Sequence, residues 1–151
     1  MRIAIVNGPN LNLLGEREPA VYGRTTLAEL ESTVAAYAAE RGVETAFFQA
    51  NGEGAIIDEL HRLRRWADGI VINPGAYTHY SYAIRDALAS IAVPAIEVHL
   101  SDIAKREAFR RISVTADVCV AQIAGLGVAS YLRGIDRLIA HAAQTTIADP
   151  E

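Results

Sequence analysis

Short runs of consecutive apolar residues alternate along the chain with longer segments in which apolar residues recur every three or four positions. We predict buried β-strands from the short runs, at residues 3–6, 44–49, 69–73, 94–99 and 116–121. The longer segments predict amphipathic helices at residues 26–42, 52–65, 81–90 and 126–143. Strands that alternate with helices favour an α/β fold, in which right-handed crossovers join parallel strands. The pattern therefore predicts one domain over residues 1–151, a flavodoxin-like, doubly wound, five-stranded parallel sheet with helices on both faces.

One segment interrupts this alternation, residues 7–23 between the first strand and the first helix. Strand-to-helix loops in compact α/β domains usually take about 2–6 residues, so this connection is unusually long. It contains polar Asn10, Arg17 and Tyr22 among glycines, prolines and leucines. The interleaved leucines argue against disorder. We interpret the segment as a lid that closes over an active site.

Composition narrows the possible partners. The chain is 51% hydrophobic and carries a net charge of −4, which argues against nucleic acid as a ligand because phosphates require a basic surface. One cysteine and four scattered histidines give no metal-ligand spacing, so we predict no metal site. The first apolar run is too short for a signal peptide or a membrane span, so we expect a cytoplasmic protein that does not bind membranes.

Polar side chains follow the first, third and fourth predicted strands. They are Asn10, Arg17 and Tyr22 after the first, Asn73 and His79 after the third, and Glu97, His99, Ser101, Arg106 and Arg110 around the fourth. The carboxyl ends of parallel strands lie at one edge of a sheet, where ligands of open α/β sheets bind. We therefore expect these side chains to form a single site.

The chemistry of these groups suits proton transfer. No G-x-G-x-x-G, phosphate-loop or G-x-S-x-G motif occurs, which disfavours nucleotide binding and serine hydrolysis. Tyr22 is a candidate base if a neighbouring cation such as Arg17 favours its phenolate, and His99 is a candidate acid oriented by Glu97. Arginine forks suit a substrate carboxylate. The set is compatible with removing a proton from one atom and a hydroxyl from its neighbour.

Several blocks of sequence resemble the type II 3-dehydroquinate dehydratases. They are Asn-Gly-Pro-Asn-Leu-Asn-Leu-Leu-Gly from residue 7, Arg-Glu-Pro from residue 17 with Tyr22-Gly, Asn-Pro-Gly-Ala-Tyr-Thr-His from residue 73, Ile-Glu-Val-His-Leu-Ser from residue 96, Ile-Arg-Asp-Ala-Leu from residue 84 and Gly-Leu-Gly from residue 125. The blocks occur in the family's order through nearly the whole chain, which makes the resemblance far more specific than a single motif.

The resemblance implies a hydro-lyase that needs no cofactor and converts 3-dehydroquinate to 3-dehydroshikimate by anti elimination of water, in the shikimate pathway of aromatic biosynthesis or in quinate breakdown. Tyr22 would be the base and His99 the acid, with Glu97 orienting His99 and Arg17 stabilising the enolate charge. Asn10 would hold a water against the enolate oxygen. The substrate's carboxylate and hydroxyls would be bound by Asn73, His79, Leu100, Ser101 and Arg110. Asp86 would serve a neighbouring subunit in a dodecamer built from trimers.

The chain departs from the family pattern at a few positions. Gly52 stands where the family often has histidine, Asp102 stands in place of asparagine, and Tyr80 and Tyr82 replace smaller residues. We expect these changes to tune binding or a subunit contact without loss of activity. Taken alone, Tyr22 also fits a residue that only packs a loop, and His99 fits a structural histidine. A non-enzymatic flavodoxin-like module that binds a small anion therefore stays open as the alternative.

Overall fold

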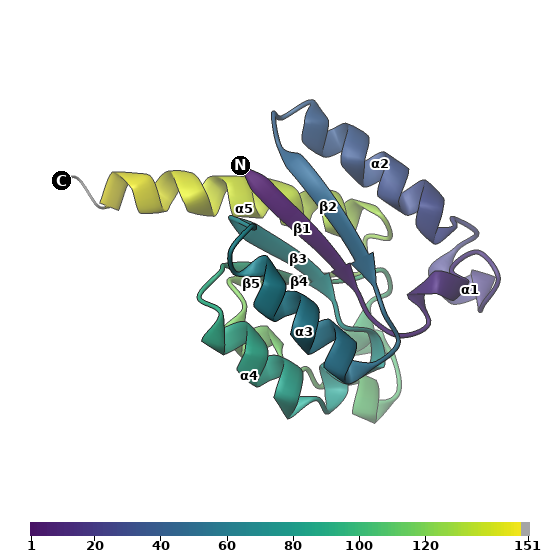
Figure 1. Cartoon of the computed structure of the whole chain (residues 1–151). Coiled ribbons are helices and arrows are strands. Elements are labelled where there is room, and N and C mark those ends of the chain that lie inside the picture. Colours follow the sequence, from purple (N-terminus) through teal and green to yellow (C-terminus); the bar gives the residue numbers. More distant parts are fainter. Residues whose placement is uncertain (149–151) are drawn as a thin grey trace.

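Five parallel strands form one sheet in the computed structural model, which describes residues 1–148 (Figure 1). The strands are β1 (Arg2–Asn7), β2 (Glu44–Gln49), β3 (Gly69–Asn73), β4 (Ala95–His99) and β5 (Ala121–Ala124). Their spatial order is β2-β1-β3-β4-β5, so the direction of winding reverses between β1 and β3. This order is that of flavodoxin-like sheets, as the sequence predicted.

Helices cover both faces of the sheet (Figure 1). Helices α2 (Leu27–Ala39) and α5 (Ala129–Ala148) pack on one face, and α3 (Glu53–Leu63) and α4 (Tyr82–Ser90) pack on the other. Alternate side chains of β1 enter the two cores: Ile3 and Ile5 contact the first, and Ala4 and Val6 the second. Burial on both faces explains why the central strands read as continuous apolar runs.

Helices α2 and α4 begin at side-chain caps. Thr26 Oγ1 accepts a hydrogen bond from the Glu29 amide over 3.2 Å at the start of α2, and Ser81 Oγ accepts one from the Ile84 amide over 3.0 Å at the start of α4. Each bond satisfies an amide that has no partner within the helix. Ser81 also donates to Glu53 on α3 over 2.6 Å, which joins the two helices of that face.

The prediction of the fifth strand was wrong in position. Residues 116–118 form a 3-10 helix, and the strand that pairs with β4 starts only at Ala121. The cause is Ser113, whose Oγ accepts hydrogen bonds from the amides of Thr115 and Ala116 and turns the chain there. Sequence pattern alone does not register such a side-chain turn, because the residues that follow are as apolar as a strand.

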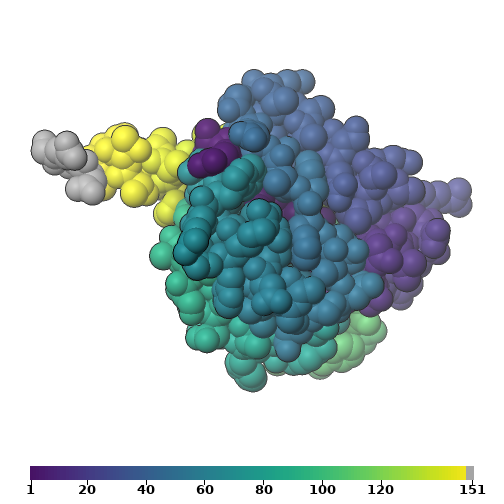
Figure 2. All heavy atoms as spheres, in the orientation of Figure 1, coloured from purple at the N-terminus to yellow at the C-terminus, as the bar shows by residue number. Residues whose placement is uncertain are grey.

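The last helix also differs from its predicted bounds. It starts at Ala129, after Gly127 with φ of 59°, and it runs through Ala148, five residues past the predicted end. Its C-terminal part extends beyond the rest of the molecule (Figure 2), and residues 142–148 are exposed. Among residues 1–148, no helix combines the length and apolar character needed to cross a bilayer.

The predicted lid is ordered and contains short helices. A 3-10 helix forms at Leu11–Leu13, and helix α1 forms at Pro19–Tyr22. Leu11 and Leu14 are buried in the core that α2 and α5 cover, which anchors the first half of the segment. The segment is therefore attached to the sheet at its start and presents Arg17 and Tyr22 from its second half.

Candidate active site

The carboxyl ends of β1 and β3 bring two loops together at the edge of the sheet. The Gly8 amide donates to the Asn73 carbonyl over 2.8 Å. A Cβ on Gly8 would lie 2.5 Å from the Pro74 carbonyl oxygen, and one on Gly75, which has φ of 61°, would lie 3.1 Å from that of Pro9. Both glycines are thus required by the close approach of the loops. A cavity of about 160 Å³ lies beside this junction.

The cavity collects most of the side chains that the sequence selected. Its walls include ten of them: Asn10, Arg17, Tyr22, Asn73, His79, His99, Leu100, Ser101, Arg106 and Arg110. Glu97 lies behind His99, and Asp86 lies on the exposed side of α4, outside this cavity. The expectation that one sheet edge gathers the polar groups is therefore met, whereas their roles stay predictions.

Two arginines flank the phenol of Tyr22. Arg106 Nη1 donates to the Tyr22 hydroxyl over 3.0 Å, and the Arg17 guanidinium carbon lies 4.9 Å from the centre of the ring. Both guanidinium groups thus lie against the phenol. The sequence suggested Arg17 as the activating cation, but the hydrogen bond comes from Arg106, which had been given no role. Arg106 Nη1 also reaches Ser101 Oγ at 3.4 Å and so links the lid to the end of β4.

Arg17 makes its own ion pair within the lid. Its Nη2 lies 3.0 Å from Glu18 Oε2, and this bond lowers the pKa of the Glu18 carboxyl. Glu18 adopts φ of 35°, a left-handed conformation that is costly for a residue with a Cβ. It also precedes Pro19, which restricts its backbone further. The lid therefore holds Arg17 next to Tyr22 at the expense of local backbone strain.

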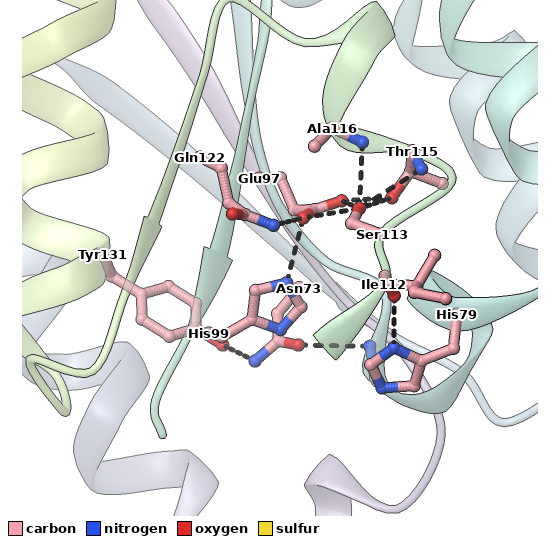
Figure 3. A network of polar contacts seen from close by, with 11 residues as sticks. Asn73, His79, Glu97, His99, Ile112, Ser113, Thr115, Ala116, Gln122 and Tyr131 are labelled. Atoms are coloured by element: carbon pink, nitrogen blue, oxygen red, sulfur yellow. Dashed lines mark hydrogen bonds and ion pairs between the residues drawn. The ribbon is translucent and has the colours of Figure 1, made fainter. Parts of the chain in front are cut away.

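A buried carboxylate supports His99 (Figure 3). Glu97 is 0% exposed and His99 is 5% exposed, and Glu97 Oε2 lies 3.0 Å from His99 Nε2. Glu97 also accepts hydrogen bonds from Ser113, Thr115 and Gln122. Burial alone would raise the pKa of Glu97, but the bonds from His99, Thr115 and Gln122 outweigh burial and lower it. The carboxylate is thus kept ionised and accepts a hydrogen bond from His99 Nε2–H.

His79 is held by a backbone carbonyl on the opposite side of the cavity. Its Nδ1 lies 2.7 Å from the Ile112 carbonyl oxygen, which can only accept a hydrogen bond. Nδ1 therefore carries a proton, and in the neutral ring Nε2 is an acceptor. The ring of Phe109 meets His79 edge-on, with centroids 6.0 Å apart. Such a histidine suits a ligand hydroxyl that donates to Nε2.

Asn73 is oriented by a buried tyrosine from α5. Its Nδ2 donates to the Tyr131 hydroxyl over 3.0 Å, and its Oδ1 accepts from the Gly75 amide over 3.1 Å. The Tyr131 hydroxyl in turn donates to Asn7 Oδ1 over 2.6 Å. Burial raises the pKa of Tyr131, so it remains a neutral donor. With these bonds made, Asn73 offers the second hydrogen of its amide nitrogen to a ligand.

The remaining predicted residues complete one wall of the cavity. Arg110 lies 3.1 Å from Glu107 through its Nε, and its guanidinium carbon lies 5.2 Å from the centre of the Phe109 ring. The amide of Asn10 donates to Asn51 Oδ1 over 3.0 Å, which ties the start of the lid to the loop after β2. Within residues 1–148, no three His, Cys, Asp or Glu side chains converge as a metal site would require.

Comparison with known proteins decides the family. The sequence model described as dehydroquinase class II matches residues 1–139. The chain is 57% identical over 139 residues to the 3-dehydroquinate dehydratase of Carboxydothermus hydrogenoformans, covering 92% of this chain and 90% of that protein. It is 55% identical over 140 residues to that of Lachnoclostridium phytofermentans, covering 92% and 97%. The chain belongs to the class II dehydroquinase family.

Solved structures agree with this assignment. The type II dehydroquinase of Butyrivibrio crossotus superimposes with a TM-score of 0.90 at 50% identity, covering 92% of this chain and 97% of that one. The flavodoxin-like α/β fold predicted from the sequence is thereby confirmed. The resemblance to type II dehydroquinases that the sequence motifs carried is confirmed as well.

The residues that depart from the family pattern do not line the cavity. Gly52 caps α3, and a Cβ there would meet only the Ala55 Cβ at 4.0 Å. Asp102 Oδ1 accepts from the Ala104 amide over 3.1 Å and so caps a short 3-10 helix. Tyr80 and Tyr82 are 60% and 71% exposed. That these changes leave activity intact stays a prediction.

Sequence reasoning gave no role to the residues that hold the site residues in place, although it expected Arg106 at this sheet edge. Arg106, Tyr131 and the Glu97 partners Ser113, Thr115 and Gln122 contribute no reacting group that a motif would single out. Arg106 carried the clearest signal, since an arginine after a strand that ends in Glu-Val-His is a candidate for the same sheet edge. Ser113 and Thr115 gave a weaker one, because polar residues next to an apolar run resemble an ordinary turn.

Proposed function

We propose that this chain dehydrates 3-dehydroquinate to 3-dehydroshikimate, the activity after which its relatives are named. The observation that carries the proposal is the pairing of a phenol flanked by two guanidinium groups with a buried carboxylate–histidine pair, all around one cavity. A phenolate is a base and a histidine supported by a carboxylate is an acid, so the cavity can remove a proton and a hydroxyl from neighbouring atoms.

In the first step, Tyr22 takes the proton from the carbon next to the substrate ketone. The C–H electron pair moves into the ring and leaves an enolate whose negative charge rests on the former ketone oxygen. Arg17, beside the Tyr22 ring, stabilises this charge, and Asn10 holds a water against the same oxygen. Arg106 keeps Tyr22 in place through its hydrogen bond.

In the second step, the enolate collapses and expels the hydroxyl from the next carbon. His99 donates its proton to this hydroxyl, which leaves as water while the conjugated enone forms. Glu97 stabilises the imidazolium form of His99 before the transfer through the bond to Nε2. The proton gained by Tyr22 and the one lost by His99 balance, so a proton transfer between the two sites restores the enzyme without a cofactor.

Substrate binding divides among the other walls of the cavity. Arg110 and the Leu100–Ser101 corner at the end of β4 suit the carboxylate, because guanidinium forks and hydroxyls donate to anions. Asn73 donates the second hydrogen of its side-chain amide to the substrate, and His79 Nε2 accepts a hydrogen bond from a substrate hydroxyl. These roles leave each polar group of the substrate with a partner of the matching kind.

We propose further that the protein is a homo-oligomer, a dodecamer built from trimers, in which Asp86 enters the site of a neighbouring subunit. Its position on the exposed side of α4, outside the cavity of its own chain, is consistent with this role. We also propose that the protein acts in the cytoplasm, in aromatic biosynthesis or in quinate breakdown, the two routes that the family resemblance implies.

The alternative is a non-enzymatic flavodoxin-like module that binds a small anion. Arginines and asparagines would serve both functions, but an anion-binding protein has no need of Tyr22 or of an ionised Glu97 behind His99. Ultraviolet absorbance separates the two, because the product enone absorbs and the substrate does not. We expect purified protein to raise the absorbance of 3-dehydroquinate solutions. Heat release on mixing without any rise in absorbance would support the binding module and refute the enzyme.

A further inference from the structure

Residues 112–115, which we call the 112–115 segment, contact His79 directly and are linked to His99 through Glu97 (Figure 3). The Ile112 carbonyl accepts from His79 Nδ1 over 2.7 Å. One and three residues later, the hydroxyl groups of Ser113 and Thr115 donate to Glu97, which is bound to His99. The 112–115 segment thus holds the proton on Nδ1 of His79, and it also binds the carboxylate that supports His99.

The Glu97 carboxylate is enclosed by donors on both oxygens. Ser113 Oγ lies 2.9 Å from Oε1 and 3.0 Å from Oε2, and Thr115 Oγ1 donates to Oε1. Gln122 donates to Oε2, next to the His99 Nε2 bond. An ionised carboxylate can only accept hydrogen bonds, so every one of these contacts favours the charged form.

The 112–115 segment is itself fixed from two sides. The Val114 amide donates to the Thr78 carbonyl over 2.8 Å, and Arg85 Nη1 donates to the Val114 carbonyl over 2.7 Å. The first bond joins the segment to the turn that carries His79, and the second joins it to α4. Its hydroxyl groups therefore meet Glu97 from a held backbone.

The hydroxyl groups of Ser113 and Thr115 affect His99 as an acid because they influence whether one proton lies on His99 Nε2 or on Glu97. Nε2 of His99 is occupied by Glu97, so Nδ1 is the nitrogen left to face the cavity. Nδ1–H is a strong acid only while the ring is an imidazolium. If Glu97 loses donors it becomes more basic and takes the Nε2 proton, which leaves a neutral imidazole and a weaker acid.

We propose that Ser113 and Thr115 are positioning residues of the dehydration, which keep Glu97 ionised so that His99 remains an imidazolium acid. The inference rests on the proposed function and adds to it two residues that touch neither substrate nor His99. If the hydroxyl groups had a purely structural role and only compensated the burial of Glu97, their removal would lower stability and leave turnover unchanged.

Four variants test this inference. Thr115→Val removes the hydroxyl at constant volume, Ser113→Ala removes the other, and Thr115→Ser keeps an oxygen in place. Thr146→Val makes the same chemical change on the exposed end of α5, where Thr146 Oγ1 donates to the Ala142 carbonyl. For each, kcat, KM, the pH dependence of kcat and the melting temperature are measured, together with the ¹⁵N shifts of the His99 ring.

The expected result is a loss in kcat of about ten-fold or more for Thr115→Val, with KM within about two-fold of the wild type. The limb of the pH profile that reports the Glu97–His99 pair shifts, and the His99 ¹⁵N shifts move toward those of a neutral ring. Besides His99, the titratable group against Glu97 in residues 1–148 is Cys119, and burial together with the Glu97 charge raises its pKa to about 12. Cys119 therefore stays neutral in the assay range.

Unchanged kcat, pH profile and ¹⁵N shifts in both Thr115→Val and Ser113→Ala would overturn the inference, even if the melting temperature fell. A similar loss in Thr115→Ser would also overturn it, because the oxygen is retained there. If the wild-type protein itself forms no enone, the proposed function fails, and the ¹⁵N shifts still decide whether the hydroxyls hold the proton on His99.

Discussion

Arg106 donates a hydrogen bond to the hydroxyl of Tyr22 over 3.0 Å, although the two residues lie 84 positions apart in the sequence. Arg106 belongs to the segment after β4, and Tyr22 belongs to the lid after β1. The bond therefore fastens the second half of the lid over the cavity and places a positive charge at the oxygen that we propose as the base. In the proposed mechanism, closure of the lid would bring this charge and the base together.

Arg106→Ala should lower kcat by about ten- to one-hundred-fold, since hydrogen bonds to charged groups contribute roughly 1.5–3 kcal/mol and each 1.4 kcal/mol is about ten-fold in rate. The assay is enone absorbance, with Arg65→Ala in the exposed turn after α3 as the control. An Arg106→Ala rate within a few-fold of the wild type would contradict the role of Arg106.

Arg17→Ala should abolish turnover while substrate still binds, because Arg17 acts on the enolate charge that is absent from the ground state. Calorimetry measures binding, and enone absorbance measures turnover. Arg24→Ala is the matched control, since Arg24 is an exposed arginine directly after the lid. Turnover retained in Arg17→Ala, or lost equally in Arg24→Ala, would contradict the assignment.

His99→Ala should separate the two halves of the reaction. With Tyr22 intact, the variant still removes the proton next to the ketone, so deuterium from heavy water should replace that hydrogen in recovered 3-dehydroquinate. Formation of the enone should fall by about 10²–10⁴-fold, the usual contribution of a general acid. Proton NMR follows the exchange, with a protein-free solution as the control. Elimination at the wild-type rate would remove His99 from its role.

The stability of the fold should depend on pH through Glu97. Its pKa is lowered in the folded chain from the ordinary 4.5, so its contribution is complete above that value and is lost as pH falls through it toward the folded pKa. Denaturation at several pH values should show that Glu97→Gln is less stable than the wild type at neutral pH and that the difference shrinks in acid. Glu44→Gln, at an exposed position of β2, should show no such dependence. A difference that grows in acid would contradict the ionised state of Glu97.

The fold could be predicted because its central strands are buried on both sides. Residues 69–73 are apolar at four of five positions, and the structure buries all of them, so pattern and environment coincide. The pattern failed at residues 116–121, where Ser113 turns the chain by accepting two amide hydrogen bonds before an equally apolar run. Local side-chain bonds of this kind leave no periodic signal.

Most residues of the site could be predicted from the sequence, but the hydrogen bonds between them could not. Tyr22, His79 and His99 follow strand ends, so a parallel sheet brings them to one edge whatever their distance in sequence. Which arginine meets Tyr22 depends on the path of the chain after β4, and that path has no regular pattern to reveal it. Ser113 and Thr115, two of the partners of Glu97, belong to the same irregular stretch, which explains why they too escaped notice.

Turnover of Tyr22→Phe is the most direct test of the account, because this change removes one oxygen atom and leaves the ring between Arg17 and Arg106. Enone formation at saturating 3-dehydroquinate should fall by about 10²–10⁴-fold relative to the wild type, as expected for loss of a general base. Tyr82→Phe makes the same change at a tyrosine that is 71% exposed and lies outside the cavity, and it should keep the wild-type rate. A Tyr22→Phe rate within a few-fold of the wild type would show that Tyr22 is not the base.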